Sequence, residues 1–206
     1  MPLTTQTQHI TLDRLIYHSP TSFEIAESRL RSSIQNNHKG SQSEDRTFQQ
    51  TASTPSPATH PTDKTSFEAS IAPKLGPHGF MYFTEFNHGN WLQFYTPPTS
   101  AVTDTPSGTT KNLRAIRYVL GNPLVAITML RHDLDAGLSV PVELYLVEEP
   151  EGGVKIIWFR PSGLVAGYEG ANSELVDAAR VLDAKLERFV RYVLDEEDEG
   201  SGGGKL

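Results

Sequence analysis

The chain has 206 residues, a formal net charge of −7 and no cysteine. Without thiols it has no disulfide, no thiolate metal ligand and no cysteine nucleophile, and its acidic balance argues against nucleic acid binding, which needs clustered basic side chains. No apolar signal segment follows the N-terminus and no apolar run approaches the roughly 18 to 20 residues that span a bilayer, so we expect a soluble, cytoplasmic protein without nucleic acid or membrane partners.

The first predicted elements are a strand and an amphipathic helix. Residues 9–18 mix β-branched, aromatic and polar side chains, which is typical of a strand. The next segment, 19–34, opens with a capping box in which Thr21 accepts a hydrogen bond from the backbone of Glu24. An apolar stripe then recurs at helical spacing and indicates a face turned to a core: Phe23, Ala26, Leu30 and Ile34.

Residues 36–66 differ in composition from the rest of the chain. Ser, Thr, Gln, Pro and His dominate this segment, and Phe48 is its only large hydrophobic residue. Such a segment buries too little apolar surface to offset an ordering cost of roughly 1–2 kcal/mol per residue. We interpret it as a disordered insert within one domain, because the piece of chain before it is too short to fold alone.

After the insert, the sequence predicts a short helix within residues 66–79. Two strands are predicted next, at 80–86 and 91–95, and the tight turn 87–90 joins them. Residues 97–112 are rich in Pro and Thr and are expected to form another polar loop.

A further strand is predicted at 113–120, followed by a short helix. Asn122 is a good N-cap for that helix, and Pro123 suits its first position because the missing N–H would be unpaired there. The alternating segments 141–149 and 154–161 then predict a hairpin.

The clearest predicted element is a long C-terminal helix that begins after Asn172. Its apolar side consists of Leu175, Ala179, Leu182, Leu186, Phe189 and Val193. Residues 195–206 are acidic and then Gly-rich, and we expect them to form a flexible tail. The predicted fold class is therefore α+β: a single domain over residues 9–194 with a mainly antiparallel sheet, helices packed on it, and the long C-terminal helix.

The segment YVLGNPLVAITMLRHDLDAGLSVPVELYLVEE, residues 118–149, resembles the "domain of unknown function 302" family. Asn122-Pro123, Gly137-Leu138 and Pro141 carry the resemblance, and FNHGNWLQFY is similar to a fungal-type branch. The resemblance implies a compact α+β domain that forms a homodimer. Bacterial members often carry cysteines near the Asn-Pro and Pro positions, so the absence of cysteine here means that thiol or metal chemistry at those positions does not carry over.

One candidate acid/base pair lies at the turn between the two predicted strands. Glu85 and His88 are three residues apart, and Trp91 stands beside them. Histidine titrates near neutrality, so such a pair can act as general acid and base. The structural alternative is a simple turn, in which Asn and Gly supply positive φ angles.

A second candidate follows the short helix, at Arg131-His132-Asp133. In a functional interpretation Asp133 orients His132, and Arg131 binds a carboxylate or phosphate. The alternative is helix capping, because basic residues are favourable at a helix C-terminus. No Gly-x-Ser-x-Gly motif supports a hydrolase triad.

Metals and cofactors have little support in the sequence. The seven histidines show no helical i, i+4 ligand spacing, so a metal site would have to be assembled in space from Glu85, His88 and His132. Asn122-Pro123 offers backbone N–H groups to an anion, although helix capping explains the same residues. We therefore expect no metal and no cofactor.

The predicted sheet carries many aromatic residues that form either core or the floor of a pocket: Trp91, Phe94, Tyr95, Tyr145, Trp158 and Phe159.

The sequence does not define a function. Our preferred hypothesis is a small-molecule-binding domain with an aromatic-lined pocket, whose ligand-binding residues are Trp91, Asn122, Arg131, Tyr145 and Trp158. The first alternative is a cofactor-independent lyase or isomerase in which Glu85, His88 and His132 are catalytic. The second is a scaffolding protein that recruits partners through its insert and tail. Convergence of the three catalytic candidates on one concavity would favour the enzyme, and dispersal would favour binding or scaffolding.

Overall fold

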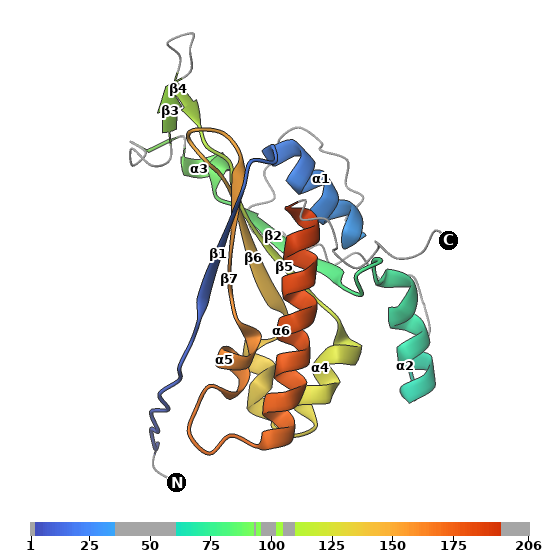
Figure 1. Cartoon of the computed structure of the whole chain (residues 1–206). Coiled ribbons are helices and arrows are strands. Elements are labelled where there is room, and N and C mark those ends of the chain that lie inside the picture. The colour runs from blue at the N-terminus through green and yellow to red at the C-terminus, as the bar shows by residue number, and fades with distance from the viewer. Residues whose placement is uncertain (1–2, 36–60, 93, 96–101, 105–109, 195–206) are drawn as a thin grey trace, which may run out of the picture.

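The computed structural model describes residues 3–35, 61–92, 94–95, 102–104 and 110–194 (Figure 1). Its centre is one five-stranded antiparallel sheet in the order β1-β7-β6-β5-β2. The strands are β1 (Arg14–Ser19), β2 (Met81–Asn87), β5 (Ala115–Gly121), β6 (Val142–Glu148) and β7 (Val154–Phe159). The consecutive strands β5, β6 and β7 lie in the middle, and the two strands from the N-terminal half form the edges.

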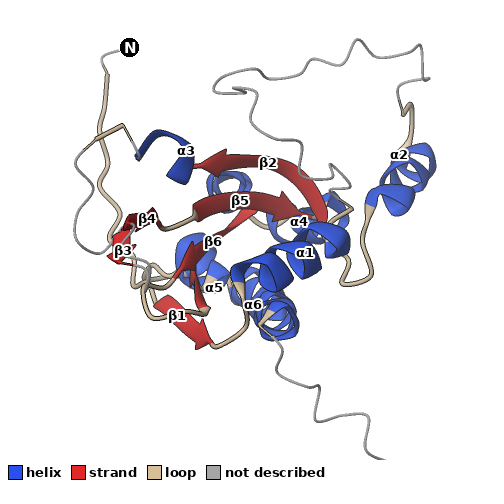
Figure 2. Cartoon of the chain, turned by 90° about the horizontal axis from the view of Figure 1, so that it is seen from above, coloured by secondary structure: helices blue, strands red, loops and turns tan. Residues whose placement is uncertain are grey.

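Helices cover one face of this sheet. Figure 2 places α1 (Phe23–Ser33) and α6 (Ser173–Val193) on the same side of it, and α4 (Pro123–Leu130) and α5 (Pro161–Ala166) pack against α6. The 3₁₀ helix η3 (Leu134–Ser139) connects α4 to β6, and α2 (Lys64–Ile71) continues into the 3₁₀ turn η1 (Ala72–Lys74) before β2. No helix in the described parts of the chain is long and apolar enough to cross a membrane.

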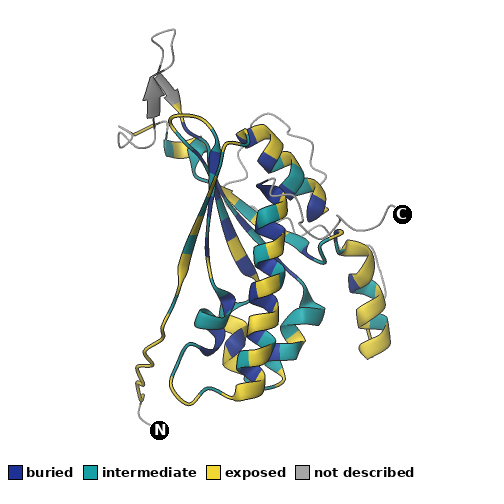
Figure 3. Cartoon of the chain, in the orientation of Figure 1, coloured by how far each residue is buried: buried dark blue, intermediate teal, exposed yellow. Residues whose placement is uncertain are grey.

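The core lies between the covered face of the sheet and the long helix α6 (Figure 3). Side chains alternate along β6, where Leu144 and Leu146 are fully buried and Tyr145 between them is only partly buried. The stripe predicted for the C-terminal helix is buried throughout: Leu175, Ala179, Leu182, Leu186, Phe189 and Val193. Burying this apolar face holds the helix on the sheet.

The predicted fold class is confirmed, and several of the local signals act as expected. Asn122 caps α4 by accepting a hydrogen bond from the Leu124 amide at 2.8 Å, with Pro123 at the first helical position. Asn172 caps α6 in the same way, through the Glu174 amide at 2.8 Å. The predicted hairpin is the antiparallel pair β6–β7.

Other predicted elements were wrong. The strand predicted at 91–95 is wrong, because Trp91 and Leu92 belong to the short helix α3 (Gly89–Leu92), and β2 pairs with β5 instead. The helix α1 is capped by Ser22, which accepts from the Ile25 amide at 3.3 Å, and not by Thr21. The residue that accepts a hydrogen bond from the first turn of the helix is therefore one position later in the chain than the sequence pattern predicts.

The boundaries of the polar segments also differ. The predicted insert ends too late, because α2 begins at Lys64 with an Asp63–Ser66 capping box. The predicted loop 97–112 contains the short antiparallel pair β3 (Val102–Asp104) and β4 (Thr110–Asn112). Residues 36–60 and 195–206, which hold most of the predicted insert and tail, lie outside the described residues.

Candidate functional site

Glu85 lies on the covered face of the sheet and forms an ion pair with Arg31. Its carboxylate accepts two hydrogen bonds from the Arg31 guanidinium of α1, at 2.7 and 2.9 Å. Tyr118, its cross-strand neighbour on β5, has a pKa raised by burial and by the nearby Glu27 carboxylate. Glu85 therefore ties α1 to the sheet, as a bidentate pair does.

His88 lies at the end of β2, with its backbone N–H donating to the Ala115 carbonyl at 2.9 Å. Its ring contacts two aromatic rings edge-on, those of Trp91 and Tyr145, each with a centroid separation of 5.7 Å. Within the described residues its side chain makes no hydrogen bond to a carboxylate. The structure thus separates His88 from Glu85, which points to the opposite face.

His132 lies beyond the other end of β5. Its Nδ1 atom is 3.3 Å from a carboxylate oxygen of Glu174, and its Nε2 atom is 3.1 Å from Nε of Arg131. Asp133 does not orient this ring; it caps η3 and accepts a hydrogen bond from Tyr168 at 2.9 Å.

The three catalytic candidates do not converge. His88 is bonded to the first residue of β5, whereas His132 follows the helix that starts after its last residue. A strand of this length spans about 20 Å at 3.3 Å per residue. Among the described residues no group of three potential metal ligands comes together either. This dispersal favours binding or scaffolding over an acid/base enzyme.

The predicted aromatic ligand residues are divided between the two faces of the sheet. Trp158 is 2% exposed and packs in the core beside Tyr17, with ring centroids 6.2 Å apart. Its indole Nε1 is buried and has no hydrogen-bond partner among the described residues. Tyr145 and Trp91 lie on the other side, and Arg131 is exposed at the end of α4. These side chains do not line a common pocket.

The uncovered face of the sheet is mainly apolar. One row of cross-strand neighbours runs across all five strands on this side: Phe86, Arg117, Tyr145, Ile157 and Ile16. Phe86 is 48% exposed and Ile16 is 45% exposed. Arg117 is paired with Glu143 of the neighbouring strand and lies over the Phe86 ring. We call this row, together with Glu143 and Phe159, the open sheet face.

A cavity of about 210 Å³ lies where α4, η3 and the ends of β5 and β6 meet α6. Its lining is almost entirely apolar, and Asn122 supplies the one polar side chain among the described residues that form it. The lining residues are Phe83, Gly121, Asn122, Pro123, Val125, Ala126, Met129, Leu130, Gly137, Val140, Pro141, Val142 and Leu182. Of the predicted ligand residues only Asn122 belongs to it, and apart from Phe83 its apolar walls are aliphatic.

Local backbone features shape this cavity. A β-bulge in β2 leaves Phe83 without a partner on β5 and turns its ring over the end of the sheet. A Cβ atom on Gly121 would lie only 3.1 Å from Pro141 and 3.3 Å from the Phe83 ring, so a glycine lets these walls meet. Two hydrogen bonds fix the Asn122 side chain: its Oδ1 atom accepts from the Leu124 amide, and its Nδ2 atom donates to the Gly79 carbonyl at 3.0 Å.

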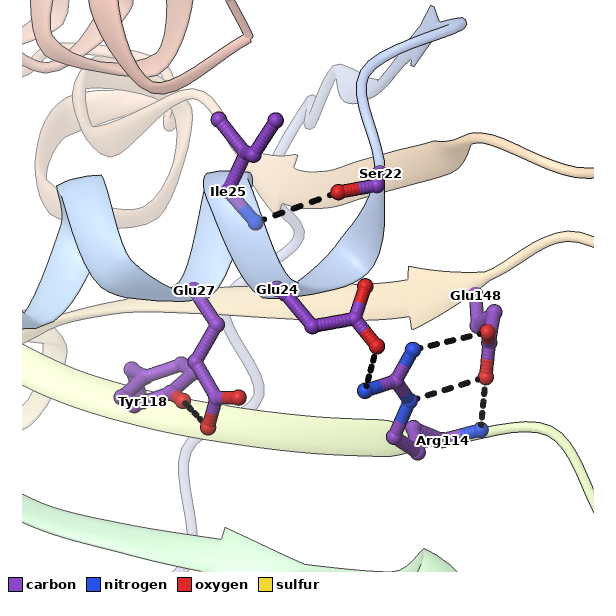
Figure 4. Close-up of polar contacts among 7 residues, drawn as sticks. All are labelled: Ser22, Glu24, Ile25, Glu27, Arg114, Tyr118 and Glu148. Atoms are coloured by element: carbon purple, nitrogen blue, oxygen red, sulfur yellow. Dashed lines mark hydrogen bonds and ion pairs between the residues drawn. The ribbon is translucent and has the colours of Figure 1, made fainter. Parts of the chain in front are cut away.

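A charged cluster at the start of α1 has a structural role that the sequence did not indicate (Figure 4). Arg114 donates to the nearly buried Glu148 at 2.8 and 3.0 Å and lies 2.7 Å from Glu24. The guanidinium also lies over the Phe23 ring, at 4.2 Å from its centroid. Hydrogen bonding to Arg114 lowers the pKa of the Glu24 carboxyl. The cluster fixes α1 on the sheet and leaves no open site.

Residues 109–192 match the family model described as "Domain of unknown function DUF302", and the predicted resemblance to this family is confirmed. Every lining residue of the cavity except Phe83 lies within the matched segment. A crystal structure of an uncharacterized conserved DUF302 protein from Bacillus stearothermophilus superposes with a TM-score of 0.52 at 16% identity. The match covers 86% of this chain and 94% of that one, and at this identity it shows the fold alone. No curated protein matches the chain. These matches leave the predicted fungal-type branch untested.

Proposed function

With the DUF302 match as the premise, we propose that the chain binds a small, mostly apolar molecule in the cavity beside α4. The observation that supports this most strongly is the cavity itself, with about 210 Å³ of space, apolar walls and one amide side chain. An apolar cavity of about 150 Å³ in another protein stays dry and binds benzene. A ring or a short chain of similar or slightly larger size therefore fits here.

Binding is better supported than catalysis. No titratable side chain belongs to the lining formed by the described residues. General acid/base chemistry needs a titratable group within hydrogen-bond reach of the substrate, and none of the three predicted catalytic residues belongs to the lining. Glu85 is engaged by Arg31, and His88 and His132 lie at opposite ends of β5.

The test is a titration with n-hexanol and toluene, followed by methyl NMR and calorimetry. Val125 lines the cavity and is partly buried, so Val125→Phe should fill the space and abolish binding while the melting temperature changes little. Val176, equally partly buried but on α6 and outside the lining, provides the matched control Val176→Phe. Absence of binding by the wild type, or unchanged binding by Val125→Phe, would refute the proposal.

A second candidate function is self-association through the open sheet face. Antiparallel sheets with one solvated face usually present polar side chains to water, whereas this face exposes Phe86, Ile16 and Phe159, each by more than 40%. Its charged side chains are the Arg117–Glu143 pair in the middle of the sheet, and Arg14, His18 and Lys155 along β1 and β7. An isologous interface uses the same surface of both copies, so Arg117 of one copy can pair with Glu143 of the other across the two-fold axis.

Light scattering coupled to size exclusion tests the homodimer. Ile16→Glu places a charge on the open sheet face and should convert the dimer to a monomer. Val181 is also an exposed apolar β-branched residue, at 67%, but it lies on the solvent side of α6, so Val181→Glu is the control that should remain dimeric. A monomeric wild type would exclude this assembly.

A further inference from the structure

Lys185 occupies a confined position on the side of α6 that faces the loop before β2. Its Nζ atom lies 5.4 Å from the centre of the fully buried Phe80 ring. Gly79 adopts a positive φ of 70°, and a Cβ atom at that residue would lie 2.6 Å from the same Nζ. The glycine therefore leaves the room that the ammonium group occupies.

Within the described residues this ammonium has no carboxylate partner, in contrast to several other partly buried cations. Arg31, Arg114, Arg117 and Arg191 are each ion-paired. No carboxylate among the described residues lies within 4 Å of Lys185. Burial, and secondly the repulsion of Arg188, lower the pKa of the Lys185 ammonium. A partly desolvated cation beside a second cation is stabilised by an anion.

Lys185 is not among the residues that line the cavity, but it lies about one helical turn from one of them. It follows Leu182, a lining residue, by three positions, and residues at this spacing share one side of a helix. Gly79 links the two sites, because a Cβ atom on it would meet the Lys185 ammonium and its carbonyl accepts the hydrogen bond from Asn122. The Asn122 amide nitrogen carries a second N–H in addition to the one it gives to Gly79.

We infer that the ligand of the cavity is a small carboxylic acid, with its hydrocarbon part in the cavity and its carboxylate held by Lys185 and the Asn122 amide. This inference rests on the proposed small-molecule binding and specifies its ligand class. One carboxylate oxygen accepts a hydrogen bond from the Lys185 ammonium, and the other accepts one from the Asn122 amide. The negative charge of the carboxylate neutralises the positive charge of Lys185. The cavity volume of about 210 Å³ suits an acid of the size of hexanoate or benzoate.

The experiment compares two pairs of probes of equal shape and different charge: hexanoate with n-hexanol, and benzoate with benzyl alcohol. Their dissociation constants are measured for the wild type, for Lys185→Met and for Arg180→Met. Methionine keeps most of the apolar stem of the lysine, is one atom shorter, and removes the charge. Arg180 is an exposed cation of the same helix, so its substitution controls for the loss of one positive charge.

The wild type and Arg180→Met should bind each acid about tenfold more tightly than its alcohol, the size of one charge-assisted hydrogen bond. Lys185→Met should lose this preference and keep its affinity for the alcohols. An acid preference that survives in Lys185→Met, or a wild type that binds both members of each pair equally, overturns the inference while leaving the proposed cavity function standing. A wild type that binds none of the four probes refutes both.

Discussion

Truncating Leu182 probes the cavity and the core at once. Leu182 is 3% exposed, belongs to the core stripe of α6 and also lines the cavity. Leu186, one turn further along the helix, is fully buried and lies outside that lining. Both Leu→Ala changes remove three carbon atoms, which costs about 2.4 kcal/mol at about 0.8 kcal/mol per buried carbon.

The two substitutions should differ in the cost of the new void. A new void in a packed core raises the total cost to about 3–5 kcal/mol, and we expect this value for Leu186→Ala. Leu182 already borders an empty space and loses fewer packing contacts, so Leu182→Ala should cost only about 2–3 kcal/mol. Urea unfolding with a common m-value measures both changes. Equal costs, or a larger cost at Leu182, would show that the cavity is closed in solution.

Three further predictions concern single side chains. Asn122→Ala removes the cap of α4 and its bond to Gly79, and should lower the unfolding free energy by about 1–2 kcal/mol in urea; no loss would contradict the capping role. The hydrogen bond that the Tyr17 hydroxyl donates to Glu187, at 2.8 Å, is the chief cause that lowers the pKa of the Glu187 carboxyl. The ionised carboxylate therefore stabilises the fold at neutral pH, and this contribution is lost as the pH falls through the lowered pKa. Tyr17→Phe should lower the unfolding free energy more at neutral pH than in acid, and a loss that does not depend on pH would refute this. Gly79→Ala introduces strain at a positive φ and should cost about 1–3 kcal/mol in a thermal melt. Gly170→Ala, where φ is also positive but nothing lies within 4 Å, should cost a similar amount, because the Lys185 ammonium at Gly79 ends a flexible side chain and can move away; a much larger cost at Gly79 would show that it cannot.

The elements that could be predicted from the sequence are those specified by neighbouring residues. The stripe from Leu175 to Val193 defines α6 by its period alone, and Asn122-Pro123 marks the start of α4 through cap chemistry. Residues 91–95 were wrongly predicted to be a strand because the preference of aromatic residues for strands depends on context, and Gly89–Leu92 form the short helix α3 instead.

The candidate site could be predicted only in part, because its walls come from segments that are distant in the chain. Asn122 was recognised as a possible ligand residue from its position at a helix start, and it does line the cavity. Phe83 and Leu182 reach the same space from a bulge and from the last helix, and no local pattern connects them. No sequence pattern singled out Lys185 as a ligand residue, because a lysine on an amphipathic helix is usually solvated.

The strand order of the sheet has a consequence for how the chain folds. The central strands β5, β6 and β7 are consecutive: a short turn joins β6 to β7, and the segment that holds α4 and η3 joins β5 to β6, so these strands can pair at a smaller entropic cost than β1 and β7. The edge strand β1 pairs with β7, near the opposite end of the described chain, and closing such a long loop is slow. We therefore expect the central meander to nucleate folding, with β1 docking last, so that the backbone amides of β1 exchange with solvent sooner than those of β6.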